Sequence, residues 1–297
     1  MVVNYRHYFI EFFLNMFPES PIISVSDLHH NISSTDIRII DTRFSLFDKN
    51  EGNALYKKNH IIGASYADLD KDLAGNITKS TGRHPLPDVD VISEKLRLWG
   101  VNKSSHVIAY DQNNGSIASR LWWLLKWLGH RKVYVLDGGY LEWKKNDFPV
   151  DNSTPSYEMG DFSPIMKEKK IWNTNLISRW VNQSKNFLLV DGRDENRFKG
   201  FEEPIDKIAG HIPGALNVPF THFIDKDGKW KKPNEIQAIW ERYKINNDVE
   251  WAVMCGSGVT ACHLSISAEL AGLSAPKLYP GSWSEWISCK NRPIVNE

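Results

Sequence analysis

Short apolar runs alternate with longer helical stretches along this chain. In the first half, the run H-V-I-A-Y at 106–110 is followed by leucines that lie three, four and seven positions after Leu121, and then by K-V-Y-V-L at 132–136. That leucine spacing places the side chains on one face of a helix, and Gly129 is typical of a helix end. Strands and helices in alternation predict an α/β fold, in which a mainly parallel sheet is flanked by helices.

This pattern occurs twice. The landmarks that recur in the same order are Asp41 and Asp191, His60 and His211, Asp111 and Cys255, and Gly138 and Gly281. Their offsets are 150, 151, 144 and 143 residues, so the spacing is kept apart from one short length change. A period of this length is too long for a solenoid repeat and indicates two copies of one domain.

We expect an N-terminal domain at 18–150, a linker at 151–170 and a C-terminal domain at 171–297. The linker begins with a polar stretch that contains two prolines and no apolar period. The segment 1–17 is aromatic and apolar but is interrupted by charged residues. We interpret this segment as a terminal helix whose apolar face lies on the body of the protein.

Composition narrows the class of protein. The 297 residues include 36 Lys and Arg and 36 Asp and Glu, and a net charge of zero argues against a broad nucleic-acid-binding surface. We expect no membrane span and no signal peptide, because no apolar run is long enough and no cleavage site follows the first one. Three cysteines are too few for a disulfide framework, and no paired Cys/His spacing indicates a metal site. A free thiol fits a reducing compartment, so we expect a cytoplasmic protein.

The second copy places a cysteine where a strand ends. The run W-A-V-M at 251–254 leads to Cys255, then to G-S-G at 256–258, and a helical stretch begins near Thr260. Glycines allow close backbone approach, and the free N–H groups and positive end of a helix stabilise an anion. At such sites the pKa of a cysteine falls from about 8.5 to roughly 3.5–7.5. We therefore predict that Cys255 is a nucleophile.

Other interpretations of this loop fit less well. A free cysteine is often a small buried hydrophobe, which is how we interpret Cys262 and Cys289. The letters G-S-G-V-T-A match the loose dinucleotide fingerprint, but that motif should open a domain, and here about half a domain precedes it. A cysteine phosphatase needs an arginine that closes the loop around phosphate, and the stretch 255–262 contains no cation.

Taken together, the tandem repeat, H-I-P-G-A at 211–215, C-G-S-G-V-T-A-C at 255–262 and Y-P-G-S-W-S-E-W at 279–286 resemble the two-domain rhodanese family of sulfurtransferases. The resemblance covers roughly residues 20–290. The neutral loop is similar to that of the 3-mercaptopyruvate sulfurtransferases, whereas thiosulfate sulfurtransferases tend to carry basic residues there. The family fold consists of two tandem rhodanese-like domains, of which only the second is catalytic.

The resemblance implies a ping-pong reaction without a cofactor. Cys255 takes sulfur from 3-mercaptopyruvate as a persulfide and releases pyruvate, and then passes the sulfur to cyanide or to a thiol such as that of thioredoxin. Asp111 stands at the cysteine position of the first domain, which therefore lacks the nucleophile. Two alternatives stay open, namely a thiosulfate:cyanide sulfurtransferase and a non-enzymatic persulfide carrier or sensor.

The resemblance also assigns roles around Cys255. It implies that Arg197 binds the substrate carboxylate, whereas we interpret Arg193, which repeats Arg43 of the first copy, as part of a buried ion pair. The family usually has another arginine shortly before H-I-P-G, and here Lys207 is the only cation in that stretch. Lysine lacks the planar fork of arginine.

Ser257 matches a family serine that is proposed to handle protons together with a first-domain histidine and an acid. His60 is the matching histidine and Asp48 a candidate acid, although His211 holds the same place in the second copy, which favours a turn-capping role for both histidines. The remaining loop residues are expected to line the substrate site: Gly256, Gly258, Val259 and Thr260.

Overall fold

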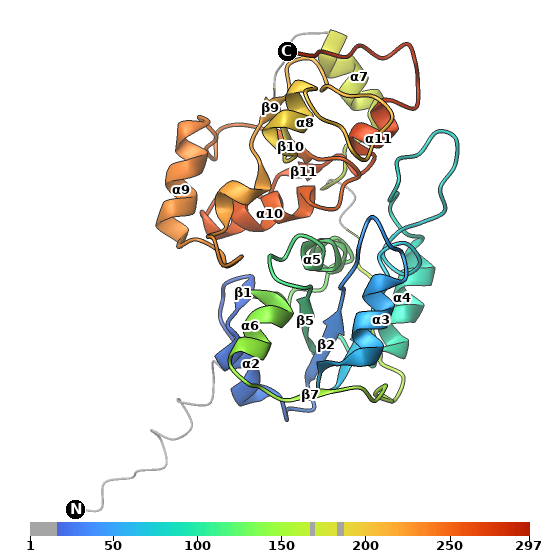
Figure 1. Ribbon diagram of the computed structural model, residues 1–297, viewed down its shortest axis with the longest axis vertical. Helices are drawn as coiled ribbons and strands as arrows, with labels where there is room; N and C mark the ends of the chain where they lie inside the picture. The colour runs from blue at the N-terminus through green and yellow to red at the C-terminus, as the bar shows by residue number, and fades with distance from the viewer. Residues whose placement is uncertain (1–16, 167–169, 183–186) are drawn as a thin grey trace, which may run out of the picture.

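The computed structural model describes residues 17–166, 170–182 and 187–297. The terminal helix that we predicted at 1–17 lies outside these residues except for Phe17. Two α/β lobes follow one another along the chain and meet at a single interface (Figure 1). In the part of the chain that is described, no helix is both long enough and apolar enough to cross a membrane.

The first lobe is built on a parallel sheet of five strands in the order β1-β6-β5-β2-β4. These strands are β1 (Ile22–Ile23), β2 (Ile37–Asp41), β4 (Ala64–Tyr66), β5 (His106–Tyr110) and β6 (Val133–Leu136). Its helices are α2 (Val25–Asn31), α3 (Glu51–Lys58), α4 (Val89–Leu98), α5 (Ala118–Trp127) and α6 (Gly139–Lys145). A small antiparallel pair, β3 (His60–Ile61) with β7 (Val150–Asp151), closes its far end.

The second lobe repeats this plan with a parallel sheet in the order β11-β10-β8-β9. Its strands are β8 (Leu188–Asp191), β9 (Leu216–Asn217), β10 (Trp251–Met254) and β11 (Lys277–Leu278). Its helices are α7 (Thr174–Asn182), α8 (Glu195–Lys199), the 3-10 helix η2 (Phe220–Phe223), α9 (Pro233–Arg242), α10 (Ala261–Leu270) and α11 (Ser282–Trp286). The two sheets confirm the predicted α/β fold and its repetition.

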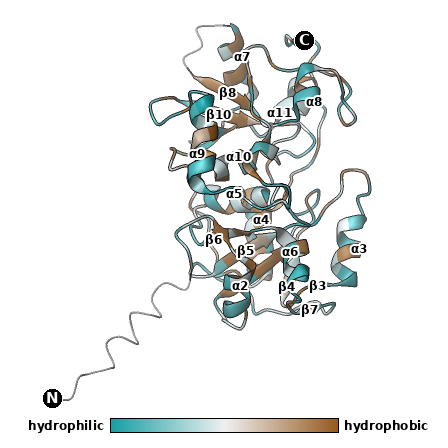
Figure 2. Ribbon diagram, turned by 60° about the vertical axis from the view of Figure 1, so that its left-hand side comes forward, coloured by the Kyte–Doolittle hydropathy of each residue, from teal (hydrophilic) through white to brown (hydrophobic). Residues whose placement is uncertain are grey.

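The central strands are largely apolar, and β6 and β10 contain no charged residue, because helices cover both faces of each sheet. All four residues of β10 are buried, and Figure 2 shows β5 and β6 as hydrophobic strands inside the first lobe. Helix α5 confirms the predicted helix, although all of its residues except Lys126 are buried, and the chain leaves it at Gly129 with a φ of 90°.

The lobes are joined by α5 and α10, which lie side by side where the two lobes meet in both views (Figures 1 and 2). Every residue of α10 from Ala261 to Ala268 is buried, because one side of the helix faces its own sheet and the other faces the first lobe. A single apolar cluster contains Leu121 and Trp123 of α5 together with Leu264 and Ile266 of α10. Burial of so much apolar surface fixes the relative position of the lobes.

Residues 151–166 of the predicted linker follow the first lobe. The backbone N–H groups of Gly160, Phe162 and Ile165 donate to carbonyl oxygens of that lobe, at N···O distances of 2.8, 3.2 and 2.8 Å. This strap pairs backbone groups that a free linker would leave to water.

Candidate active site

Cys255 lies at the carboxyl end of β10, a central strand of the second sheet. The backbone N–H of Gly258 donates to its Sγ at 3.2 Å, and the backbone N–H of Cys255 donates to Ser282 Oγ at 3.1 Å. Gly258 has a φ of 76°, and a Cβ at this position would collide with the carbonyl of Pro280. Only glycine therefore allows the loop to turn its amide back toward the sulfur.

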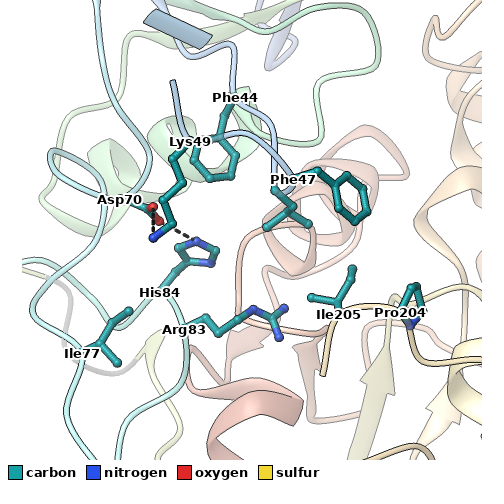
Figure 3. Close-up of a pocket in the computed structure, with 10 residues that line it drawn as sticks. Phe44, Phe47, Lys49, Asp70, Ile77, Arg83, His84, Pro204 and Ile205 are labelled. Atoms are coloured by element: carbon teal, nitrogen blue, oxygen red, sulfur yellow. Dashed lines mark hydrogen bonds and ion pairs between the residues drawn. The ribbon is translucent and has the colours of Figure 1, made fainter. Parts of the chain in front are cut away.

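A cavity of about 70 Å³ lies over this loop, at the interface between the lobes. From the second lobe it is lined by Arg197, Ile205, Cys255, Gly256, Ser257, Val259 and Thr260, and from the first by Leu46, Leu69, Arg83, His84 and Ile117. A wider cavity of about 240 Å³ shares Leu46, Arg83, His84 and Ile205 with it and forms a vestibule (Figure 3). Cys255 lies at the bottom of the smaller cavity and is only 2% exposed. The site can therefore bind a small molecule but cannot contact a flat protein surface.

Ser257 is hydrogen-bonded to a histidine of the first lobe. His84 Nδ1 lies 2.7 Å from Ser257 Oγ, and His84 Nε2 lies 3.1 Å from Asp70 Oδ1, an interaction drawn in Figure 3. Burial lowers the pKa of His84, so its ring is neutral near pH 7. The hydrogen bond from His84 lowers the pKa of Asp70 to about 2, which keeps that carboxylate ionised. The neutral ring therefore donates from Nε2 to Asp70 and accepts the Ser257 hydroxyl at Nδ1.

The prediction that His60 approaches Ser257 is wrong. His60 contacts two carbonyl oxygens, that of Tyr56 at 2.7 Å and that of Ser153 at 3.0 Å, and its ring stacks on Tyr56. Its counterpart His211 bonds the carbonyl of Phe198 at 2.9 Å and stacks on that ring in the same way. The repeat identified a structural histidine, because an interaction kept in both copies serves the fold.

Asp48 is also not the acid of this site, since its carboxylate accepts the backbone N–H of Asn50 within its own turn. The acid is Asp70, which also binds Lys49 Nζ at 3.2 Å. His84 and Asp70 lie in loops of the first lobe that have no counterpart among the landmarks of the repeat. Sequence reasoning missed them for that reason.

Two arginines converge on the Cys255 loop. A Cβ built on Gly256 would lie 2.9 Å from Arg83 Nη2 and 3.5 Å from Arg197 Nη2. Arg197, on α8, was predicted to reach this site, whereas Arg83 comes from the first lobe and was not foreseen. Lys207 lines a neighbouring cavity and not that of Cys255, so the additional cation at the site is Arg83.

Both arginines are paired with buried acids. Arg197 Nη2 lies 2.8 Å from Glu203 Oε1 and 3.2 Å from Asp206 Oδ2, and Arg83 Nη1 contacts the other oxygen of Asp206. Glu203 Oε1 also accepts the backbone N–H groups of Ile205 and Asp206 at 3.1 and 3.0 Å. In the stretch where the family usually has an arginine, this chain carries Glu203 and Asp206, which pair with the two arginines of the site.

Arg193 forms the buried ion pair that its repetition predicted. Its guanidinium binds Asp191, with Nη2–Oδ2 at 2.8 Å, as that of Arg43 binds Asp41. Cys262 is also buried, and its pKa is raised to about 12 because burial penalises the thiolate. These side chains support the fold beneath the site.

Arg120 brings a further charge to the site from α5. Its side chain is fully buried and donates to carbonyl oxygens, including that of Gly258 at 3.1 Å and that of His84 at 3.1 Å. It thus ties the Cys255 loop to the loop that carries His84. Within residues 17–166, 170–182 and 187–297, no three His, Cys, Asp or Glu side chains come together in a way that could hold a metal ion.

Comparisons with known proteins agree with this geometry. The profile of the Rhodanese-like domain matches residues 24–146 and again residues 176–289. The chain is 40% identical over 277 residues to a probable 3-mercaptopyruvate sulfurtransferase of Pseudomonas aeruginosa, covering 92% of this chain and 97% of that protein. It is 32% identical over 256 residues to thiosulfate sulfurtransferase of Rattus norvegicus, covering 84% and 85%.

A solved structure shows the same architecture. The 3-mercaptopyruvate sulfurtransferase from Leishmania major superimposes with a TM-score of 0.80 at 29% identity, over 93% of this chain and 76% of that one. The solved structure thus shares the fold described above, and the two matches of the profile correspond to its two lobes. The chain belongs to the rhodanese family and carries two rhodanese-like domains in tandem.

Proposed function

We propose that this protein is a 3-mercaptopyruvate sulfurtransferase that works through a persulfide on Cys255. The observation that carries the proposal is the convergence of Cys255, the Ser257–His84 pair, Arg83 and Arg197 on one small cavity. The donor has a sulfur, a keto group and a carboxylate, and the cavity offers a nucleophile, a hydroxyl and cations for these three groups. The relative from Pseudomonas aeruginosa carries the corresponding name.

In the donor half-reaction, the Cys255 thiolate attacks the sulfur atom of mercaptopyruvate. A sulfur–sulfur bond forms, the carbon–sulfur bond breaks, and its electron pair passes to the carbon as the enolate of pyruvate, which then takes up a proton. The Ser257 hydroxyl has a single proton, which neutral His84 accepts in the free site and which turns to the enolate oxygen as negative charge develops there. The Gly258 N–H that contacts Sγ stabilises the sulfur anion before and after transfer.

In the acceptor half-reaction, a thiolate or cyanide attacks the outer sulfur and releases the Cys255 thiolate. Because Cys255 lies at the bottom of the cavity, a small thiol enters directly, and a protein such as thioredoxin must present a protruding cysteine. A free thiol of this kind suits the reducing cytoplasm, where we place the protein.

Thiosulfate is the second candidate donor, and the two arginines favour it more than the neutral loop alone does. A dianion is stabilised by cations beside the attacked sulfur. The rat relative named a thiosulfate sulfurtransferase shares this family. A persulfide carrier without rapid turnover is the candidate from another class.

Turnover with both donors, side by side, tests the proposal. We expect a higher kcat/KM with mercaptopyruvate, release of pyruvate, and an intact protein that gains the mass of one sulfur atom, removable by dithiothreitol. Preference for thiosulfate would transfer the assignment to the second donor. Persulfide formation without turnover on either donor would favour the carrier.

A further inference from the structure

Asp206 occupies an unusual place in the site. Its carboxylate is 4% exposed and bridges the two arginines, with one oxygen on Arg83 and the other on Arg197. Each oxygen of a carboxylate is an acceptor, so one carboxylate can accept from two guanidinium groups at once. A carboxylate of the chain thus sits between the cations that the donor's carboxylate requires.

Arg83 retains a free donor for a ligand. Its loop is fixed to the second lobe by a hydrogen bond of 3.1 Å from its backbone N–H to Ser284 Oγ. Its Nε is buried and has no hydrogen-bond partner within the described residues. An unpaired buried donor is costly, so an incoming oxygen at this atom would be stabilising. Arg83 can therefore exchange Asp206 for a ligand and gain a bond.

We propose that Asp206 is a resident carboxylate, which competes with the donor's carboxylate for Arg83 and Arg197 and thereby selects donors of low charge. This role rests on the proposed function. The competition weakens donor binding in the ground state, but it also keeps the arginines in place and neutralised when the cavity is empty.

Selection by charge follows from the balance of the cluster. Arg83 and Arg197 carry two positive charges, and Glu203 and Asp206 carry two negative ones. A monoanion such as mercaptopyruvate adds one negative charge beside these four side chains, whereas thiosulfate adds two. Because the Coulomb energy is proportional to the ligand's charge, any factor that Asp206 costs the monoanion is about squared for the dianion.

The test replaces Asp206 by Asn, which keeps the shape and removes the charge. We expect the rate constant of persulfide formation at low donor concentration to rise roughly tenfold for mercaptopyruvate and roughly a hundredfold for thiosulfate. The reaction of a preformed persulfide with a small thiol that has no carboxylate should change less than either donor reaction, because such a thiol does not bind the two arginines. D206E should restore the ratio of the two donors to that of the native protein.

The matched control is Asp248→Asn, which removes an exposed charge from the loop before β10, at the opposite end of that strand from Cys255. It should leave the rate constant of persulfide formation unchanged with both donors. Arg83→Gln, measured in parallel, should lower this rate constant with both donors. A donor ratio that does not move in folded D206N, or that moves equally in D248N, would overturn the proposal.

Calorimetric titration with pyruvate, a monocarboxylate product, separates this inference from the proposed function. We expect pyruvate to bind D206N roughly tenfold more tightly than the native protein, whichever donor the enzyme uses. Equal affinity of D206N and the native protein for pyruvate would contradict the proposed competition. If the native protein failed to turn over mercaptopyruvate while D206N still gained pyruvate affinity, the proposed donor would be wrong and the role of Asp206 would stand.

Discussion

The loops after β5 and β10 occupy the same place in two copies of one fold, yet they begin with different residues, Asp111 and Cys255. In the first lobe, the Asp111 carboxylate accepts backbone N–H groups of Asn113, Gly115, Ile117 and Ala118 at 2.8–3.2 Å. In the second, Sγ of Cys255 accepts the N–H of Gly258 and faces a cavity. The same loop position holds a carboxylate in one copy and the Cys255 sulfur in the other.

The first lobe has Asp111 where the second has Cys255, but it contributes side chains to the cavity over Cys255. It supplies His84 and Arg83 to the cavity and Arg120 beneath it, and Asp70 orients His84. The first lobe therefore forms one wall of the cavity over Cys255. The experiments below test how far this division extends, in order of decreasing expected effect.

Replacement of Cys255, with or without a cysteine at position 111, should have the largest effect. Cys255→Ser should abolish persulfide formation, because a serine hydroxyl is not ionised near neutral pH. Asp111→Cys in that background should not restore it, since Asp111 does not line the cavity. Mass spectrometry after addition of donor measures both, with Cys262→Ala as the control that retains activity. A double variant that formed a persulfide at position 111 and turned over donor would contradict the division between the copies.

His84 and His60 provide the next comparison. His84→Ala should lower kcat with mercaptopyruvate by roughly 10²–10³-fold, because Ser257 loses the group that orients its hydroxyl. His60→Gln should instead lower the free energy of unfolding and leave kcat of the folded protein nearly unchanged. Steady-state kinetics and denaturant unfolding of both variants distinguish the roles, and a reversed pattern would return the assignment to His60.

Substitutions of Arg197 and Arg193 should likewise differ, the first acting on catalysis and the second on stability. Arg197→Lys should raise KM for mercaptopyruvate about tenfold, because lysine keeps the charge but loses a bidentate contact. The reaction of a preformed persulfide with a thiol should be unaffected. Arg193→Lys should act mainly on the melting temperature, through the buried pair with Asp191. If both half-reactions of Arg197→Lys slowed equally, Arg197 would be structural too.

The smallest expected effect is on stability in acid. The lowered pKa of His84 means that the unfolded chain takes up a proton first, so this contribution is complete above about pH 6.5 and is lost as the pH falls below it. The pKa of Asp70, about 2, means that its contribution is present above about pH 4 and is lost toward pH 2. Denaturant unfolding at several pH values should show that Asp70→Asn lacks the second loss. An unchanged profile would show that the His84–Asp70 contact adds no stability.

Much of this protein was readable from the sequence because the signals are local. The spacing of apolar residues predicted the repeated α/β fold, and the strand, cysteine and glycines at 251–258 predicted the turn around Cys255. The Asp191–Arg193 pair was equally accessible, since its members are two residues apart and repeat Asp41 and Arg43. The domain boundaries at 150 and 171 stay a prediction, although the double match of the profile is compatible with them.

Only the tertiary structure decided which first-lobe residues reach the sulfur. Ser257 and His84 are 173 positions apart, and Asp206 and Arg83 are 123 apart. These contacts exist because α5 and α10 bury apolar surface against each other and so bring two loops outside the repeat to one edge. Local sequence determines how a loop turns, because its hydrogen bonds lie within a few residues. Which residues of the other lobe a loop contacts depends on how the two domains pack. That packing is set by apolar side chains spread along α5 and α10, which form no short motif in the sequence.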